Sequence, residues 1–517
     1  MRAKCWEFSN EPFSRAIPPS SDPMSITRRT FVKKSIATIG LASTFAISGS
    51  RASGRILGAN DRVRVGVVGI NDRGAAHIQA FGKMPNVEVA YLIDVDTTTH
   101  ARRADDVEKN FGYKPVCVQD MQKAIEDKNL HAVSIATCNH THSFLTVRAA
   151  QAGKDVYVEK PCSHNVFEGR KCIEAADKYK VIIQHGTQQR TSNSRAVQLA
   201  ALSSGQYGKL KIVKGYCCKP RWTIGYKPEE PPPETLAWDL WLGPAPLQPF
   251  HRNLVHYNWH WFWDTGNADM GNQGVHEMDL ARWMSHKTLP NSVVTFGARY
   301  VNEPEKGFKD QGQTPNQTLS LYDYGDLMLL FETRGLVRNN TDWKPRVDVE
   351  FYTDKGVISA TVLYTRAGTN NTAVFTPYDS NETIEIGVEN DELSESPFKN
   401  FIDCVRSRNR SALKADIVEG HYSSALCHLG NISYRLGATA SVDSIKTAFG
   451  DDPIVQKAIG DVMKNTTDAL PGLENPLWTL GPKLGFNPKT EKFIDNATAD
   501  KLLTREYRTP YVVPENV

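Results

Sequence analysis

Hydrophobic positions recur with two different periods along the first part of this chain. Between residues 63 and 189, short runs of β-branched and aliphatic residues, each as long as one buried strand, alternate with stretches that have the period of an amphipathic helix. Strands and helices in regular alternation predict an α/β fold with a doubly wound parallel sheet. The predicted strands are 63–68, 87–93, 115–118, 132–136, 155–158 and 181–185, and the predicted helices are 74–81, 97–111, 120–126, 142–152 and 166–179.

The pattern changes after residue 190. Residues 220–249 are rich in proline and tryptophan, and this stretch is too long and too irregular for a hairpin, which is typical of a functional loop. Alternating apolar and polar runs then predict a C-terminal α+β domain whose open-faced, mostly antiparallel sheet has one face on helices and one face free. The predicted strands are 292–300, 318–324, 327–333, 347–353 and 384–387, and the predicted helices are 274–283, 398–408 and 418–436.

A chain of 517 residues is too long for one hydrophobic core, so these patterns also indicate domains. We expect the parallel-sheet domain at residues 53–189 and a substrate-binding and oligomerisation domain at 190–440, with the helix at 418–436 returning to the first domain. Residues 441–517 are expected to form an arm that packs on the body, and a disordered tail is the alternative for the proline-rich end.

The first 52 residues have the features of an export signal. They contain the pair Arg28-Arg29, a weakly apolar stretch at 36–49 that is too short to span a bilayer, and a small-residue cleavage site at 50–52. A twin-arginine signal exports folded proteins, so we expect a periplasmic protein without a membrane span in its mature form. A basic disordered tail and an uncleaved anchor are the alternatives, and Met24 is an alternative start to Met1.

Charge and cysteine content exclude several classes of protein. The net charge is +3, but residues 1–52 alone carry +5, so the remainder of the chain is slightly acidic. This distribution does not indicate a nucleic-acid partner. The nine cysteines are scattered and form no C-x-x-C pair, so the sequence predicts neither a disulfide framework nor a metal site.

A strand, a glycine turn and a helix follow one another between residues 63 and 81. The pattern G-x-G-x-x-G lets the backbone approach a pyrophosphate at a helix N-terminus, and it appears here as Gly69-x-Asn71-x-x-Gly74. Asparagine tolerates a positive φ, so we expect the turn to survive the loss of the middle glycine. Ile70 and Arg73 complete the predicted cofactor-binding turn. An ordinary strand–helix unit without a ligand is the alternative.

A carboxylate ends the second predicted strand. Asp94 follows Gly69 by 25 residues and can accept hydrogen bonds from the ribose hydroxyls of an adenosine. The same carboxylate would repel a 2′-phosphate, so we expect NAD, with NADP as the less favoured cofactor. The turn and Asp94 together predict that the first domain is a Rossmann domain that binds a dinucleotide.

Polar residues follow the fourth, fifth and sixth predicted strands, at the sheet edge where ligands bind. Lys160 stands where a substrate hydroxyl and a nicotinamide would meet, and a desolvated lysine there can have a lowered pKa and act in acid–base chemistry. A surface turn is the alternative for this Glu-Lys-Pro sequence. The predicted cofactor contacts in these loops are Thr137, Asn139, His142, Glu159, Lys160 and Gln188, and Arg190 is a predicted substrate contact.

Aromatic and polar residues are interleaved between residues 259 and 276. Aromatic rings pack on the C–H faces of a sugar while its hydroxyls need polar partners, so this stretch predicts a sugar site. His276, one turn into the predicted helix at 274–283, is a candidate general base, and a buried structural histidine is the alternative. The other predicted substrate contacts are Trp259, His260, Asn272 and Asp279.

Taken together, these motifs resemble the Gfo/Idh/MocA family, the relatives of glucose–fructose oxidoreductase and inositol dehydrogenase, over roughly residues 60–440. The resemblance rests on the glycine turn, Asp94, the sequence Glu159-Lys160-Pro161 and the helix start at Gly274-x-His276. It implies NAD(P) in the first domain and an open-faced sheet in the second. It also implies that Lys160 and His276 lie at the reacting carbinol.

Two positions depart from the pattern of that family. Asn71 replaces the middle glycine of the turn. Asn272 stands four residues before His276, where inositol dehydrogenase-like members carry an aspartate that orients or charges the histidine. Asp269 and Asp279 are the candidates to replace that carboxylate.

We therefore predict an NAD(P)-dependent oxidoreductase that acts on a carbinol of a sugar or glycoside. An exported enzyme has no large pool of free dinucleotide, so the cofactor should be held tightly, with residues 53–61 as a clasp over the adenosine. The alternatives are an NAD-dependent glycosidase, which oxidises, eliminates and re-reduces its substrate, and a non-catalytic sugar-binding protein. We expect a homo-oligomer, formed through the free face of the second sheet.

Overall fold

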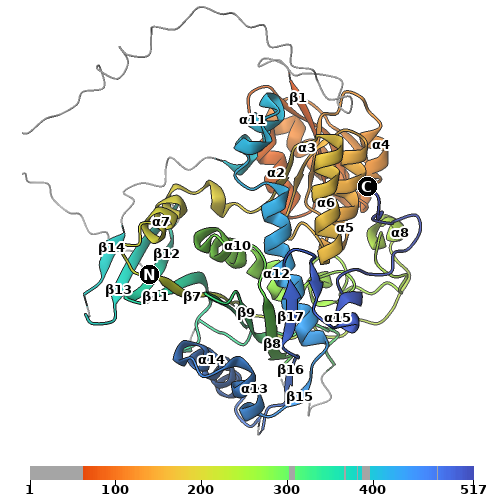
Figure 1. Ribbon diagram of the computed structural model, residues 1–517. Coiled ribbons are helices and arrows are strands. Elements are labelled where there is room, and N and C mark those ends of the chain that lie inside the picture. The colour runs from red at the N-terminus through yellow and green to blue at the C-terminus, as the bar shows by residue number, and fades with distance from the viewer. Residues whose placement is uncertain are drawn as a thin grey trace, which may run out of the picture. The chain divides into compact units, whose positions relative to one another are not determined.

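Figure 1 shows a computed structural model of the chain. It describes residues 62–301, 309–339, 341–365, 368–380, 382–386, 396–473 and 475–517. The predicted export signal at 1–52 and the predicted clasp at 53–61 lie outside these residues. Within the part of the chain that the structure describes, no helix is both long enough and apolar enough to cross a membrane.

Residues 63–185 form a parallel sheet with the strand order β3-β2-β1-β4-β5-β6. This order confirms the prediction of a doubly wound sheet. The order of the strands reverses between β1 and β4, and ligands bind at the carboxyl ends of the strands beside such a switch point. The elements are β1 Val63–Val68, α2 Arg73–Gly82, β2 Val87–Ile93, α3 His100–Phe111, β3 Val116–Val118, α4 Met121–Ile125, β4 Ala132–Ile135, α5 Asn139–Gln151, β5 Asp155–Val158, α6 Val166–Tyr179 and β6 Ile183–His185.

The central strand β1 is buried on both faces. Val65 and Val67 are fully buried in one hydrophobic cluster with Phe81 of α2, while Val68 belongs to the cluster on the other face with Val147 of α5. A strand covered on both sides takes apolar residues at successive positions, and this is why β1 appears in the sequence as a continuous β-branched run.

A second sheet has the strand order β14-β13-β12-β11-β7-β10-β9-β8-β16-β15, with β17 also paired to β8. Its described pairs are antiparallel except β7 with β10, so the prediction of a mostly antiparallel sheet is confirmed. β7 was not predicted, because seven successive buried residues hide the alternation that marks a strand. The strands are β7 Leu210–Cys218, β8 Ser292–Ala298, β9 Gln317–Asp323, β10 Met328–Arg334, β11 Arg346–Thr353, β12 Gly356–Thr365, β13 Gly368–Pro377, β14 Ile384–Ile386, β15 Ala438–Ala440, β16 Trp478–Leu480, β17 Leu484–Asn487 and β18 Lys492–Phe493.

The expectation of a free sheet face is wrong for β8, β9 and β10. Helix α10 (Gly274–Ser285) packs on one face of this sheet, and α13 (Val442–Phe449) and α14 (Pro453–Ala469) cover the other (Figure 1). Phe296 and Leu330 of the sheet are buried against Ile459 of α14. The residues after 441 therefore bring their own apolar faces to the sheet, and this face is not available for oligomerisation. A homo-oligomer stays a prediction.

Two helices late in the chain return to the first domain. α11 (Pro397–Ser407), which the sequence analysis places in the second domain, inserts Phe398 and Phe401 into the cluster that contains Phe81 and Tyr157. α12 (Ile417–Arg435) lies along α6 and also contacts α10 and β8 (Figure 1). Because α12 packs on both domains, it fixes the parallel sheet against α10, and the site described below lies between these two.

Candidate active site

The glycine turn connects β1 to α2 with a close backbone approach. Gly69 has φ +78°, and a Cβ there would lie 2.6 Å from the carbonyl oxygen of Ala136 on the neighbouring strand end. A Cβ on Gly74 would lie 1.8 Å from the carbonyl oxygen of Gly69. Asn71 is not among the described residues with positive φ. The expectation that the turn survives because asparagine tolerates a positive φ is therefore wrong. Only Gly69 needs the left-handed conformation, and the middle position accepts an ordinary side chain.

Asp94 lies where the sequence predicted it, at the end of β2. Its carboxylate accepts hydrogen bonds from the backbone N–H of Ile70 at 2.9 Å and of Asp96 at 3.0 Å. Burial raises the pKa of Asp94 from its ordinary value, and these two N–H donors oppose that rise. The carboxylate is therefore tied to the glycine turn itself, since Ile70 is the residue that follows Gly69.

Two cavities adjoin Asp94 on the carboxyl edge of the parallel sheet. The inner cavity, of about 280 Å³, contains Lys160, and the outer cavity, of about 330 Å³, contains Tyr511. Both are lined by Gly69, Asp94 and Trp241, so they form one cleft with Asp94 at the junction. The predicted residues that the structure brings together around the inner cavity are Gly69, Asn71, Arg73, Asp94, Thr137, Asn139, His142, Glu159, Lys160, Trp259, His260 and Asn272.

Glu159, the residue after β5, is surrounded by donors. It accepts hydrogen bonds from Arg73 Nε at 2.9 Å and Gln188 Nε2 at 3.4 Å, and His77 Nε2 lies 3.0 Å from the same oxygen. These donors and the nearby charges hold the pKa of Glu159 well below its ordinary value despite burial. His77 was not singled out in the sequence, although a histidine on the apolar face of α2 was a visible signal. Gln188 acts on the cleft through Glu159 and does not line it.

Lys160 joins the two domains. Its ammonium donates hydrogen bonds to the backbone oxygen of Asn272 at 2.5 Å and to the side-chain Oδ1 of Asn272 at 3.3 Å, at the end of α9 (Ala268–Asn272). Burial lowers the pKa of Lys160 from its ordinary value, and the nearby charge of Glu159 opposes this. The asparagine that departs from the family pattern is thus the residue that accepts from the lysine.

Asp269 stands behind Asn272. It accepts from Asn272 Nδ2 at 3.3 Å and forms a two-pronged ion pair with Arg221 at 2.6 and 3.0 Å. Asp269 therefore contacts the residue at position 272 and shares its charge with a guanidinium, whereas Asp279 is the candidate carboxylate whose charge raises the pKa of His276.

His276 lies in the first turn of α10, close enough to Lys160 for that ammonium to act on it. Burial lowers the pKa of His276 to about 3, and the charge of Lys160 contributes next. The imidazole is consequently neutral at neutral pH and has a lone pair to accept a proton. Unlike Lys160, His276 is not among the residues that line either cavity, so its approach to a substrate stays a prediction.

Arg190 and Asp279 do not line the cleft. The buried guanidinium of Arg190 donates from Nε and Nη2 to the carboxylate of Asp279 at 2.9 to 3.0 Å, and from Nη2 to Glu419 at 2.9 Å. Ser423 Oγ donates to Asp279 as well, at 2.7 Å. Buried charges must be paired, and this pair is satisfied internally between α10 and α12, so the structure gives no support to either residue as a substrate contact.

Two predicted loop residues brace the strand ends. The ring nitrogens of His142 lie 2.7 Å from the carbonyl oxygen of Pro161 and 3.0 Å from that of Thr137, and burial lowers its pKa. Asn139 Nδ2 donates to Asn267 Oδ1 at 3.1 Å, just before α9. These contacts hold the loops after β4 and β5 against each other, and so they fix the positions of Thr137 and Lys160 beside the inner cavity.

The proline- and tryptophan-rich loop covers the cleft. Leu236 and Trp241 line the inner cavity from this loop, and His256 and Tyr257 line it from the residues that follow, so we call residues 220–257 the lid. His256 Nε2 lies 3.2 Å from Asp96 just after β2. Of the adjoining stretch, Trp259, His260 and Asn272, which were predicted as substrate contacts, line the inner cavity. The rings of Trp259 and His260 stack with centroids 3.6 Å apart. The prediction of a functional loop did not identify which residues of this lid reach the cleft, and the functional role of the loop stays a prediction.

The parallel sheet, the glycine turn and the cleft define a two-domain protein whose first domain is a Rossmann domain. Residues 63–187 match the model of an oxidoreductase family with an NAD-binding Rossmann fold, and residues 195–298 match the model of the C-terminal alpha/beta domain of such oxidoreductases. Over these two stretches the chain is similar to the Gfo/Idh/MocA family of oxidoreductases, which is the resemblance that the sequence analysis stated. Membership of an exported subgroup stays a prediction.

Curated relatives match only part of their own length. The myo-inositol 2-dehydrogenase of Thermotoga maritima is 28% identical over 29% of this chain and 44% of the relative. The levoglucosan dehydrogenase of Pseudarthrobacter phenanthrenivorans is 22% identical over 43% of this chain and 51% of the relative. A glycosyl hydrolase family 109 protein of Shewanella baltica is 27% identical over 30% of this chain and 38% of the relative. The chain thus spans about half of these relatives or less.

Solved structures share the fold. The WlbA dehydrogenase from Bordetella pertussis, solved in complex with NADH and UDP-GlcNAcA, superposes with a TM-score of 0.51 over 71% of this chain and 93% of its own. Its sequence is 17% identical, so the similarity is one of fold.

Proposed function

We propose that this protein is an NAD-dependent oxidoreductase that removes hydride from a carbinol carbon of a sugar or glycoside. The observation that carries the proposal is the contact of Lys160, from the first domain, with Asn272, four residues before His276 in the second. This contact lies at one end of a cleft that has Asp94 at its middle. Proton-transfer groups at the end of a dinucleotide cleft suit the dehydrogenation of an alcohol.

The residues of the cleft fit NAD. Helix α2 begins at Arg73 with no side-chain cap on its N-terminus, so its first N–H groups suit a pyrophosphate. The carboxylate of Asp94 accepts one backbone N–H on each oxygen and has further lone pairs for ribose hydroxyls. A 2′-phosphate at this place would meet Asp94 and Asp96 together, which favours NAD over NADP.

The two catalytic candidates divide the proton chemistry between them. Bound NAD would supply the hydride acceptor. Neutral His276 accepts the hydroxyl proton, because a pKa of about 3 leaves its lone pair free at neutral pH. Lys160 uses two hydrogen bonds on Asn272, so a third ammonium proton remains for the substrate oxygen as negative charge develops on it.

The wall opposite the Rossmann edge favours a sugar. Tyr257, with 51% of its surface exposed, and the stacked pair Trp259 and His260 line the inner cavity beside Lys160. Flat rings beside hydrogen-bonding groups match the C–H faces and hydroxyls of a sugar or cyclitol. Relatives named for inositol and levoglucosan oxidation support this class of substrate.

A glycosidase that uses NAD transiently is the second candidate, and the relative named as a glycosyl hydrolase favours it. In such a reaction, oxidation acidifies the neighbouring C–H, the aglycone is eliminated, water adds, and the ketone is reduced again. Release of p-nitrophenol from p-nitrophenyl glycosides without net NADH would select this reaction, whereas stoichiometric NADH formation selects the oxidoreductase.

We also propose that the protein is exported folded with its cofactor in place. The twin arginine at Arg28-Arg29 supports export, and the lid over the cleft supports tight retention. Replacement of both arginines by lysine should leave the protein in the cytoplasm, as cell fractionation would measure. An unchanged location would remove this part of the proposal.

The deciding experiment on function has two steps. Mass spectrometry of the purified protein should find bound dinucleotide, and a panel of sugars, cyclitols and glycosides should then produce absorbance at 340 nm. If the protein neither retains nor binds NAD or NADP, the proposed function is wrong.

A further inference from the structure

The outer cavity extends the cleft away from Lys160. It shares Gly69, Asp94 and Trp241 with the inner cavity, so Asp94 separates the two along one continuous edge. A dinucleotide whose ribose is held at Asp94 and whose nicotinamide lies toward Lys160 leaves its adenine in the outer cavity. The cavity suits a flat apolar ring, because Phe144 and Leu145 line it.

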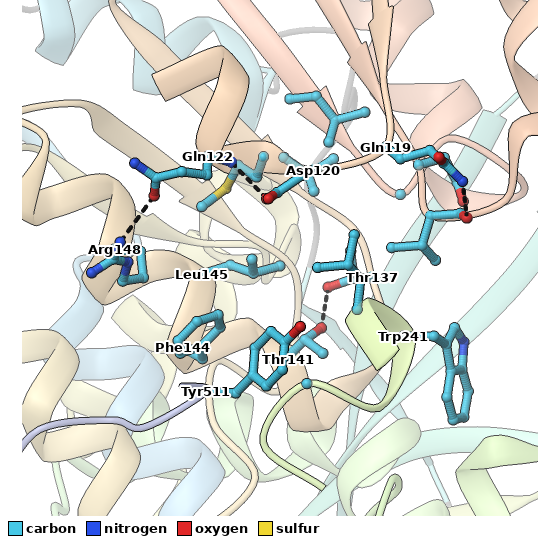
Figure 2. Close-up of a pocket in the computed structure, with 18 of the residues that line it drawn as sticks. Gln119, Asp120, Gln122, Thr137, Thr141, Phe144, Leu145, Arg148, Trp241 and Tyr511 are labelled. Atoms are coloured by element: carbon cyan, nitrogen blue, oxygen red, sulfur yellow. Dashed lines mark hydrogen bonds between the residues drawn. The ribbon is translucent and has the colours of Figure 1, made fainter. Parts of the chain in front are cut away.

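Residues far apart in the sequence close this cavity. Leu240 and Trp241 come from α8 (Trp238–Leu242) in the proline- and tryptophan-rich loop, and Pro510 and Tyr511 come from the end of the described chain. Figure 2 shows Tyr511 beside Phe144, with Trp241 on the neighbouring wall and Asp120 across the cavity. The rings of Tyr511 and Phe144 meet edge to face with centroids 5.8 Å apart.

The segment at residues 505–517 is fastened to the lid. Tyr511 Oη donates to Asp239 of α8 at 2.5 Å, and Arg508 donates to the same carboxylate. Arg508 Nη2 donates further to the carbonyl oxygens of Asp239 and Gly243, at 2.9 and 3.0 Å. Asp239 therefore joins this segment to the helix that presents Trp241.

The same segment is also anchored to the Rossmann domain. Val513 and Val517 are buried in the hydrophobic cluster that contains Ile173 of α6. Arg505 Nη1 donates to the carbonyl oxygen of Asp264, between the lid and α9. If the segment moved away from the outer cavity, its hydrogen bonds to Asp239 and the burial of Val513 and Val517 would be lost together.

We propose that the segment at residues 505–517 is part of the cofactor site, with Tyr511 in contact with the adenine ring and Asp239 as the positioning residue that keeps α8 closed over it. This rests on the proposed function, because it takes the ligand of the cleft to be a dinucleotide. The sequence analysis predicted a similar role for residues 53–61, which lie outside the described residues. The segment at residues 505–517 slows the release of the dinucleotide and has no part in the proton chemistry at Lys160.

Release of NADH tests the proposal directly. NADH fluorescence, followed after mixing the loaded protein with excess ADP-ribose, gives the dissociation rate. Tyr511→Ala should raise that rate by about tenfold, the size expected for loss of one base–aromatic contact. Tyr511→Phe keeps the ring and Asp239→Asn weakens the tie to Arg508, so each should raise the rate by a smaller factor. The matched control is Asp468→Asn, an exposed aspartate on α14 that likewise accepts from a cation and an aromatic donor, Lys464 and Trp343.

A second measurement uses the unmodified protein, so it does not depend on how the variants fold. Hydrogen exchange of residues 505–513 should slow on addition of AMP, which fills only the adenine end, and should not change with nicotinamide mononucleotide. Equal release rates in all variants, with no protection by AMP, would overturn this proposal and leave the oxidoreductase proposal intact. Failure of the unmodified protein to bind any dinucleotide would overturn the proposed function, and this inference with it.

Discussion

The two cavities of the cleft differ in some of the groups that line them. The inner cavity combines charged groups with the rings of Tyr257 and Trp259, and its key contact joins Lys160 to Asn272 across the domains. The outer cavity has Phe144, Leu145 and Tyr511 on its wall beside polar residues such as Gln119 and Asp120, and it is closed by hydrogen bonds that lie outside it, on Asp239. The difference separates two tasks of a cofactor enzyme, because proton transfer needs charges placed at the reacting atoms, whereas retention needs apolar contact and slow opening.

The largest expected effect is at Lys160. Lys160→Met should lower kcat by about a thousandfold, in the range that general acid–base groups contribute, while NADH affinity measured by fluorescence stays within about threefold. Lys219→Met is the control, since that nearby lysine donates to Gln273 Oε1 and does not line the cleft. If Lys160→Met kept full turnover, or lost NADH binding to the same extent as turnover, the division between the two cavities would be wrong.

His276 should matter next, through the pH profile. His276→Asn should lower kcat by about a hundredfold. Because the proton acceptor must be neutral and its pKa is about 3, the unmodified enzyme should show no loss of kcat/KM from His276 between pH 7 and pH 5. The pKa of Lys160 is lowered, so activity should decline on the alkaline side below the ordinary lysine value of 10.5, and Lys160→Arg should remove that decline from any activity that remains. An acid limb near pH 6.5 would contradict the buried, neutral imidazole.

Asp94 lies at the junction and should affect binding more than chemistry. Asp94→Ala removes the ribose acceptor and the acceptor for Ile70 N–H, so NAD affinity should fall by roughly tenfold, the cost of about one charged hydrogen bond. The preference for NAD over NADP should narrow, while kcat at saturating cofactor should change little. Isothermal titration with both dinucleotides measures this, and an unchanged preference would show that specificity is set elsewhere.

The smallest expected effect is on stability, at Glu159. The folded pKa of Glu159 lies below its ordinary value of 4.5, so its stabilising contribution is complete above the unfolded pKa and is lost as the pH falls through it toward the folded pKa. The difference in free energy of unfolding between the unmodified protein and Glu159→Gln should therefore shrink from pH 7 to pH 4. Glu108→Gln, at an exposed pair with Lys114, is the matched control variant.

The charged end of the cleft could be predicted from the sequence better than its apolar end. Asp94 and Lys160 each follow a short apolar run, and the carboxyl ends of parallel strands meet at one edge, so the pattern alone placed them together. Tyr511 and Asp239 are 272 positions apart, and no local period relates them. The pairing of Arg190 with Asp279 was hidden for a related reason, because a sequence shows which charges exist and not which of them are buried against each other.

The helices on the second sheet show a further limit. Residues 442–469 have an apolar face, but the sequence analysis grouped them with the arm after 441 and did not assign that face to the sheet. The sequence analysis likewise expected a left-handed conformation at Asn71, because this residue replaces the middle glycine of the motif. The geometry needs it only at Gly69, where β1 turns away beside Ala136.

The insertion of α11 beside Phe81 and Tyr157 has a consequence for synthesis of the protein. The nucleotide-binding layer, although encoded before residue 190, stays unfinished until residue 407 has left the ribosome, because two of its aromatic rings would otherwise face water. A fragment cut at residue 189 should consequently aggregate, and cofactor loading must wait until most of the polypeptide has been translated.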